Sequence, residues 1–400
     1  MTMVLNRTPA PGGELPRTGA EEPGIGERVA VTGFGLVTPM ALTSWRSVSE
    51  VIRNRGRFAW HETVLVADAP DGTALRGATV SRVSGGAARF GLTGSERSSA
   101  LLAPALREAM AGLSSLTRDA TRAWIIDGIP SGEVGAPPCP EDLLPLLSPV
   151  EYLSAGREAG TGRCLFLDRV AEAAETLREG RCETALVAAV DSLCFLPVLE
   201  GLLEGGRLLS GPNPEGIIPG EAAGAILLER EGSARKRGAS IYAFVSSWGQ
   251  GIEPALRAGG RPSQGRGLTE AFFQAFDGLS APGGEIGLVV GDLNGERHRA
   301  LEWAVTEGRI FAPADRERQL WLPAFAVGEC GAALGAVQTV VSVAALAKDT
   351  AHGKRVALYS SDDGGEKQVL CLEQGEFTDR HALNRWRREQ RAKRDTRGEG

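Results

Sequence analysis

Side chains that could do nucleophilic or acid–base chemistry are few in this sequence. The four histidines stand at positions 61, 298, 352 and 381, and the six cysteines at positions 139, 164, 182, 194, 330 and 371. Cys164 directly precedes a helix that apolar spacing predicts over residues 165–179, with Gly180 as its C-terminal cap. A thiol at a helix N-terminus has a lowered pKa and can act as a nucleophile. A free cysteine is also common in protein cores, so Cys164 is either a nucleophile or a small buried apolar residue.

Motifs for binding a metal or a cofactor are absent from the sequence. No C-x-x-C pair occurs, so we expect no structural zinc site. Gly33 and Gly35 follow a predicted strand, but no third glycine stands at the spacing of a dinucleotide-binding loop. The phosphate-binding motif G-x-x-x-x-G-K-S/T and the nucleophile elbow G-x-S-x-G are missing as well. We therefore expect neither a metal nor an organic cofactor.

The composition is that of a globular protein, with 42% apolar and 24% charged residues among 400. The net charge of −6 argues against a general nucleic-acid-binding protein, which usually carries a basic surface. The longest apolar stretch, residues 336–347, is too short to span a bilayer, and the first residues show no apolar signal-peptide core. We therefore expect a cytoplasmic protein with free thiols and no membrane span.

Strands and helices alternate along the chain and must position any reactive group. A β-branched run at 28–32 predicts a strand that Gly33 and Gly35 end. Further strands are predicted at 120–126, 184–190, 222–229, 241–246 and 286–290 and a hairpin at 356–372, with helices at 44–53, 98–113, 165–179, 268–276, 296–307 and 331–347. The βαβ pattern occurs twice, which indicates a layered α/β fold with two similar halves.

Composition sets off two tails, and the repeated βαβ pattern divides the rest of the chain into two halves. Residues 1–27 are rich in proline, glycine and glutamate and predict a disordered N-terminal tail. Residues 28–235 and 236–375 form the two predicted halves, and residues 376–400 form a basic C-terminal tail. That tail is either a helix that contacts an acidic partner or a solvated, frayed end.

Four segments resemble the β-ketoacyl synthases, or 3-oxoacyl-acyl-carrier-protein synthases, of the thiolase superfamily. They are VAVTGFGLVTP at 29–39, GRCETALVAAVDS at 180–192, GRLLSGPNPEGIIPGEAAGAILLE at 206–229 and VGECGAALGAV at 327–337, and they stand in the family's order. The resemblance covers nearly the whole chain between the tails. It implies a thiolase-like fold of five layers, α-β-α-β-α. It also implies a homodimer or a heterodimer with a true ketosynthase, with acyl carrier protein as a further candidate partner.

The nucleophile position departs from the family pattern. The family's chemistry uses a cysteine at a helix N-terminus, which becomes acylated, and two histidines that promote decarboxylation of a malonyl thioester. Counted back from Gly180 at the family's spacing, the cysteine position is held by Arg163, which could instead plug the acyl pocket. Cys164 is one residue further on, a rotation of about 100° around the helix. SSDDGG at 360–365 stands where the family has a G-F-G-G gate, which weakens any expectation of acyl-chain gating.

The two histidine positions also hold other residues. The one that follows Gly328 is held by Glu329, and the segment expected to supply the other reads GDLNG, with Asp292 and Asn294. By the resemblance, these groups and Glu296 converge at the family's catalytic floor. They form either a remodelled acid–base or binding site, or a hydrogen-bonded network that replaces the lost site.

Two functions follow from the resemblance. The first is a ketosynthase-like protein without ordinary Cys-His-His condensation, which acts as an acyl-binding or non-catalytic partner in fatty-acid or polyketide-type metabolism. The second is an active acyltransferase or condensing enzyme (3-oxoacyl-acyl-carrier-protein synthase) that uses Cys164 or another thiol in an altered geometry. The candidate catalytic residues are Cys164, Glu329 and Asp292, and the candidate substrate-binding residues are Arg163, Asn294, Gly220 and Gly328.

Overall fold

The structure is a computed structural model of the 400-residue chain. It describes residues 28–85, 91–92, 94–113, 121–129, 147–154, 162–277, 279, 286–311 and 318–376. The tail predicted at 1–27 and nearly all of the basic tail predicted at 376–400 lie outside the described residues. Of the six cysteines, Cys139 also lies outside them, and the five described cysteines are free.

The strands gather into one large mixed sheet and one hairpin. They are β1 (Val29–Val37), β2 (Ala59–Ala67), β3 (Leu75–Val80), β4 (Thr121–Asp127), β5 (Leu147–Ser154), β6 (Thr184–Ser192), β7 (Glu221–Arg230), β8 (Ala243–Ile252), β9 (Ile286–Val290), β10 (Gln319–Trp321), β11 (Arg355–Ser361) and β12 (Glu366–Gln374). Among the described residues, ten strands form the sheet, in the order β10-β9-β11-β12-β8-β1-β7-β6-β4-β5, and β2 pairs with β3. β1 and β8 pair only through residues 29–31 and 243–245, so this short crossing joins two halves of the sheet.

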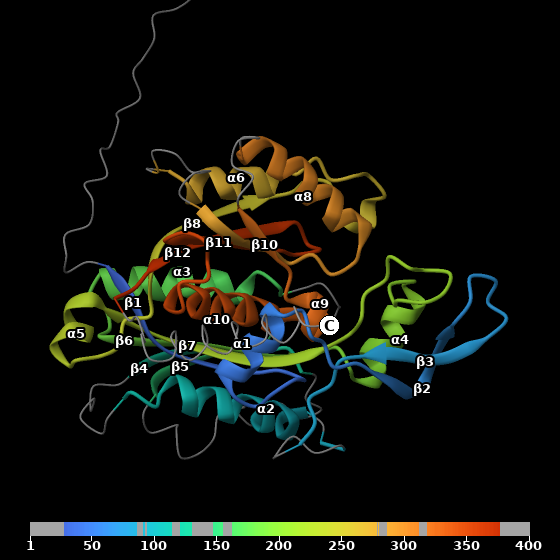
Figure 1. The fold of residues 1–400 in the computed structure, drawn as a ribbon, viewed down its shortest axis with the longest axis horizontal. Coiled ribbons are helices and arrows are strands. Elements are labelled where there is room, and N and C mark those ends of the chain that lie inside the picture. Colours follow the sequence, from blue (N-terminus) through green and yellow to red (C-terminus); the bar gives the residue numbers. More distant parts are fainter. Residues whose placement is uncertain are drawn as a thin grey trace, which may run out of the picture.

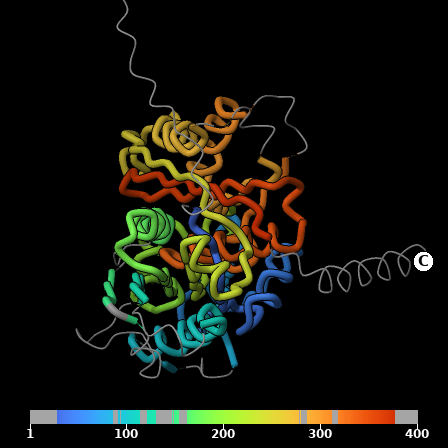
Figure 2. Tube along the Cα trace, turned by 90° about the vertical axis from the view of Figure 1, so that its left-hand side faces the viewer, coloured from blue at the N-terminus to red at the C-terminus, as the bar shows by residue number. Residues whose placement is uncertain are grey.

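Helices cover both faces of each half of the sheet. They are α1 (Ser44–Ile52), α2 (Gly94–Ala109), α3 (Leu165–Arg178), α4 (Leu196–Glu204), α5 (Glu231–Lys236), α6 (Arg266–Ala275), α8 (Arg297–Ile310), α9 (Ala324–Val327) and α10 (Leu334–Ala347), with 3-10 turns at Arg257–Gly259 and Gly331–Ala333. α3 and α10 lie between the two halves and contact β7 on one side and β12 on the other (Figure 1). Figure 2 shows α3 beneath the strands of the C-terminal half.

The outer layers complete the architecture. α6 packs on β8 and β12 and carries α8, whereas α2 packs on β1, β7 and β6 at the opposite side of the molecule (Figure 1). The predicted α-β-α-β-α layering is therefore confirmed. Every residue of α10 is buried, as expected for an apolar helix enclosed between two sheets. The division into halves near residue 235 falls between β7 and β8 and stays a prediction.

The prediction that Gly33 and Gly35 end the first strand is wrong. β1 continues through both glycines to Val37. A methyl group at Gly33 would stand 1.9 Å from the backbone oxygen of Ala109, and one at Gly35 would stand 1.8 Å from that of Ala105. The two glycines therefore let α2 approach the sheet closely, and they mark helix packing rather than a turn.

Other elements differ from their predicted bounds or were not predicted. α2 begins at Gly94 and ends at Ala109, four residues earlier at each end than the predicted helix at 98–113. The β2–β3 hairpin, α4 and β5 had no periodic signal strong enough to predict them. No helix within the described part of the chain is long and apolar enough to cross a membrane.

Candidate functional site

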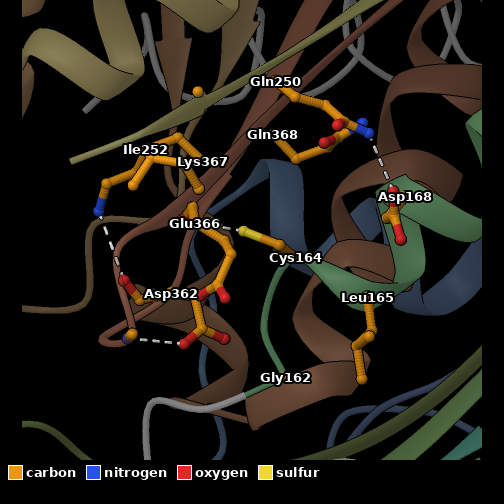
Figure 3. A pocket seen from close by; sticks show the side chains of 12 residues that line it. Gly162, Cys164, Leu165, Asp168, Gln250, Ile252, Asp362, Glu366, Lys367 and Gln368 are labelled. Atoms are coloured by element: carbon orange, nitrogen blue, oxygen red, sulfur yellow. Dashed lines mark hydrogen bonds between the residues drawn. The ribbon is translucent and has the colours of Figure 1, made fainter.

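The N-terminus of α3 presents two neighbouring side chains to different surroundings. Cys164 is the residue immediately before the helix, and Arg163 precedes it. Arg163 points into a buried ionic cluster, whereas Cys164 lines a pocket (Figure 3). Successive residues at a helix start point about 100° apart, so one residue of offset is enough to separate the two environments.

Arg163 is almost fully buried and bonds protein groups through all three guanidinium nitrogens. One terminal nitrogen donates to Oε2 of Glu329, and the other donates to the backbone oxygen and Oδ2 of Asp292 at 2.9 and 3.1 Å. Nε donates to the backbone oxygen of Ser361 at 3.1 Å. Burial alone would lower the pKa of Arg163, but Glu329 and Asp292 hold this pKa well above its usual value. Arg163 is therefore a permanent cation that neutralises two buried carboxylates.

Further ion pairs extend this cluster toward the surface. Arg207 donates to both carboxylate oxygens of Glu296 at 2.8 Å and pairs with Asp363 at 2.9 Å. Arg299 pairs with Asp363 at 2.6 Å and lies 3.5 Å from Oδ2 of Asp292. Burial would raise the pKa of Glu296, but the bidentate bond from Arg207 holds it far below its usual range. The cluster is thus ionised throughout its outer part.

Asn294 connects the inner and outer parts of the cluster. Its Nδ2 donates to Oε2 of Glu329 at 2.7 Å and to Oε2 of Glu296 at 3.1 Å. Its Oδ1 accepts the backbone N–H of Glu296 at 3.1 Å, and Oε1 of Glu329 accepts the backbone N–H of Gly331 at 3.0 Å. The structure therefore brings together Asp292, Asn294, Glu296 and Glu329, and protein groups already bond each of them.

The Cys164 thiol is bonded to the backbone and not to a base. Its single S–H is shared between the backbone oxygens of Ser360 and Glu366, which lie 3.2 and 3.3 Å from Sγ. Burial strongly raises the pKa of Cys164, and the negative charges of Asp362 and Asp292 raise it further. These effects outweigh the helix N-terminus, which by itself would lower the pKa. The thiol is therefore protonated near neutral pH and is not an activated nucleophile.

A pocket of about 600 Å³ opens beside Cys164, between the start of α3, the end of β8 and the start of β12 (Figure 3). Its lining consists of Gly162, Cys164, Leu165, Asp168, Gln250, Gly251, Ile252, Asp362, Gly364, Glu366, Lys367 and Gln368. No histidine belongs to this lining. His298 lies instead by the ionic cluster, with Nε2 3.9 Å from Oδ1 of Asp363. Burial, and then the charge of Arg299, lower the pKa of His298 to about 4.

Gly220 and Gly328 lie against one another and not in the pocket. A methyl group at Gly220 would stand 2.2 Å from the backbone oxygen of Val327, and Gly328 has a φ of 79°. The backbone N–H of Gly220 also donates to the backbone oxygen of Glu329 at 2.7 Å. Close backbone packing thus explains why glycine stands at both positions. Their role in substrate binding stays a prediction.

Arg207 and Arg299 are the members of the cluster that sequence reasoning missed. Arg207 lies 89 residues from Glu296 and Arg299 lies 64 residues from Asp363 along the chain, so no local motif links these pairs. The only local spacing among them is that of Arg299 and Glu296, three residues apart, with Nε 3.5 Å from Oε2. The signal that could have found them is charge balance, because several carboxylates expected at one buried place require cations beside them. Within the described ranges, no group of three or more histidine, cysteine or acidic side chains is arranged to hold a metal ion.

Sequence comparisons give a partial match to a known protein. No protein-family model matches the chain. The chain is 27% identical over 214 residues to the putative polyketide beta-ketoacyl synthase 1 of Streptomyces cyaneus, a match that covers 50% of this chain and 49% of that protein. The matched segment thus spans about half the length of that relative.

Solved structures match over most of the chain. One is a chain of a type II polyketide synthase acyl-carrier protein in complex with its ketosynthase, with a TM-score of 0.67, 16% identity and coverage of 87% of this chain and 99% of that one. The ishigamide ketosynthase/chain length factor matches with a TM-score of 0.64 at 19% identity and the same coverage. A beta-ketoacyl synthase from Burkholderia phymatum STM815 matches with a TM-score of 0.64 at 15% identity, again with 87% and 99% coverage. The chain therefore has the thiolase-like fold of the ketosynthases, and in sequence it is similar to a polyketide β-ketoacyl synthase.

Proposed function

We propose that the protein is a ketosynthase-like subunit without ordinary Cys-His-His condensation, which serves as an acyl-binding or non-catalytic partner in fatty-acid or polyketide-type metabolism. The observation that carries the proposal is the buried ion pair between Arg163 and Glu329. By the sequence resemblance, these residues stand at the positions of the nucleophile and of one histidine. A ketosynthase would need a thiol and an imidazole facing each other there.

The ion pair is chemically unsuited to condensation. The Arg163 guanidinium has no sulfur to form an acyl thioester, and its permanent charge leaves it without a nucleophilic nitrogen that could be acylated instead. The carboxylate of Glu329 would repel a developing enolate oxygen, which a neutral or cationic donor stabilises. Asp292 adds a second negative charge beside Arg163, at 3.1 Å from its guanidinium. The cluster thus supports a structural role for the former catalytic floor.

The partner role is drawn from the similar structures. One of them pairs a ketosynthase with a chain length factor, and another holds an acyl carrier protein in complex with its ketosynthase. We place this protein in a comparable cytoplasmic assembly, as a homodimer or as a heterodimer with an active ketosynthase. A chain of this fold that lacks the condensing residues could contribute surface and acyl-binding space to such a pair.

An active acyltransferase that uses Cys164 is the alternative. The observation in its favour is that Cys164 lines a pocket of about 600 Å³. Against it stand the raised pKa of the Cys164 thiol, its bonds to two backbone oxygens and a lining without histidine. Acyl transfer to this sulfur would require loss of its proton, and the thiol bonds backbone oxygens rather than a histidine or a carboxylate that could accept that proton.

The test is covalent labelling followed by intact-protein mass spectrometry. The purified protein is incubated with an acyl thioester of acyl carrier protein or with a cerulenin-like electrophile, beside Cys164→Ala. Our proposal predicts no stoichiometric adduct on the folded protein. A stoichiometric adduct that Cys164→Ala abolishes would support the acyltransferase instead.

The dimer is tested separately by size-exclusion chromatography with light scattering. A mass of twice the 42.1 kDa chain is expected for the homodimer. A homogeneous monomer at micromolar concentration that also fails to form a complex with an added ketosynthase would refute the partner role.

A further inference from the structure

The pocket beside Cys164 contains a buried polar atom that lacks a partner. Gln368 is only 3% exposed and lines the pocket, and its Nε2 has no hydrogen-bond partner among the described residues. Its side chain lies beside Gln250, whose amide donates to Oδ1 of Asp168 at 3.1 Å (Figure 3). A buried donor without an acceptor costs about 1–3 kcal/mol in general, so this position favours a ligand that brings an acceptor oxygen.

The charge of the pocket lining indicates that the ligand also carries a positive charge. Asp168, Asp362 and Glu366 line the pocket with a single cationic residue, Lys367. The Lys367 ammonium pairs with Oε1 of Glu302 at 3.2 Å, outside the pocket lining, and donates to the backbone oxygen of Asp362 at 3.4 Å (Figure 3). The formal charge of the lining is therefore three negative against one positive. Arg169, outside the lining, pairs with Asp168, so Asp362 and Glu366 are the carboxylates that repel anions and attract a cation.

Glu366 is the carboxylate best placed to receive a cation. Its side chain is exposed at the pocket, and its carboxylate has no hydrogen bond or ion pair within the described part of the chain. Asp362, by contrast, already accepts the backbone N–H groups of Arg163 and Gly364 at 3.0 and 2.9 Å. Leu165 and Ile252 supply an apolar wall to the same cavity.

We propose that this pocket binds a small primary amine that also carries a neutral carbonyl oxygen and an apolar group, the chemical class of α-amino amides. The ammonium lies at Glu366, the carbonyl oxygen accepts from Nε2 of Gln368, and the apolar group contacts Leu165 and Ile252. The site is separate from the Arg163 cluster and binds its ligand without covalent chemistry. It does not depend on whether Cys164 can be acylated.

Three compounds of similar size separate the contribution of the ammonium group to binding from the effect of an added carboxylate. Leucinamide carries the ammonium, the neutral carbonyl and the apolar group, whereas leucine adds a carboxylate and 4-methylpentanamide lacks the ammonium. Binding to the full chain is measured by isothermal titration calorimetry near neutral pH. We expect leucinamide to bind at least about tenfold more tightly than either comparison compound. The amide without an ammonium loses the charge-assisted contact with Glu366, and the carboxylate of leucine is repelled by the acidic lining.

Two variants and a control test the residues. Glu366→Gln is expected to weaken leucinamide binding about tenfold, and Gln368→Leu is expected to weaken it severalfold while leaving the fold intact, since Nε2 has no protein partner to lose. Glu204→Gln, an exposed residue of α4 outside the pocket lining, is the charge-matched control and should bind as the unaltered chain does. The proposal is overturned if leucinamide fails to bind at millimolar concentration, if the three probes bind alike, or if Glu366→Gln binds unchanged. None of these outcomes bears on the adduct test of the proposed function.

Discussion

Replacement of Arg163 by methionine should destabilise the protein more than any surface change. The substitution removes the cation that contacts Glu329 and Asp292 and leaves both carboxylates buried, with exposed fractions of 2% and 1%. Methionine keeps much of the side-chain volume, so the effect reports charge and hydrogen bonding rather than a cavity. The backbone oxygen of Ser361 also loses its bond from Nε.

The expected magnitude follows from what remains after the change. Removal of one member of a buried ion pair typically costs about 3–5 kcal/mol, because the uncompensated charge stays in the interior. A net stability of about 5–15 kcal/mol makes this loss large enough to shift the urea midpoint clearly. A second substitution, Glu329→Gln, removes the carboxylate that has lost its cation, while the amide can still bond its neighbours and Asp292 keeps Arg299 at 3.5 Å. The double variant should therefore be more stable than the sum of the single effects by at least about 1 kcal/mol.

The assay is urea unfolding followed by circular dichroism and tryptophan fluorescence. Arg181→Met serves as the control, since Arg181 pairs with Glu179 at the surface with side-chain exposures of 51% and 58%. It should change the free energy of unfolding by less than about 1 kcal/mol. An Arg163→Met variant as stable as Arg181→Met, or strictly additive effects of Arg163→Met and Glu329→Gln, would refute the claim that this pair is buried and coupled.

Further predictions concern packing and protonation. Gly35→Ala should lower the thermal midpoint, because the added methyl group would stand 1.8 Å from the backbone oxygen of Ala105. The control is Gly201→Ala in α4, where an added methyl group has nothing within 4 Å and should raise the thermal midpoint slightly. Equal effects of the two substitutions would contradict the close approach of α2. Burial raises the pKa of Asp191 to about 7, so the folded state keeps a proton that the unfolded state loses. The free energy of unfolding, measured with urea, should therefore fall by about 2–3 kcal/mol more in the unaltered protein than in Asp191→Asn between about pH 5 and about pH 8. The same pH dependence of this free energy in both proteins would refute the prediction. Burial and the charge of Arg299 lower the pKa of His298 to about 4. In an NMR titration, the ring-carbon resonances of His298, assigned by their loss in His298→Gln, should therefore shift with a midpoint near pH 4. A midpoint above about pH 6 would show a solvated ring and contradict the prediction.

The layered fold was predictable because its central elements carry strong local signals. The apolar run at 184–190 became β6, which is buried along its whole length, and the apolar stretch near 336–347 became α10 between the sheets. The first strand was predicted to end at Gly33 and Gly35 because glycine is common in turns. Glycine is also common where a helix packs closely on a strand, and the sequence alone does not distinguish the two cases. The β2–β3 hairpin lies outside the large sheet and has exposed apolar residues, such as Trp60 at 70%, that obscure its alternation.

The candidate site was only partly predictable, for a different reason. The resemblance placed Arg163, Glu329 and Asp292 in one region, and the structure joins them by direct ion pairs. Arg207 was not predicted because its partner Glu296 is distant in sequence and because arginine is usually a surface residue. The unpartnered amide of Gln368 depends on the position of each neighbouring atom and has no sequence signal at all.

Decarboxylation of a malonyl thioester tests the central claim most directly. Malonyl-loaded acyl carrier protein is incubated with the purified protein, and the release of carbon dioxide is compared with that of a protein-free sample and of Cys164→Ala and Glu329→Gln. The buried pair of Arg163 and Glu329 predicts release at the protein-free rate in every sample. Catalytic release that Cys164→Ala or Glu329→Gln abolishes would contradict the account, because it would require a working condensation site at this helix N-terminus.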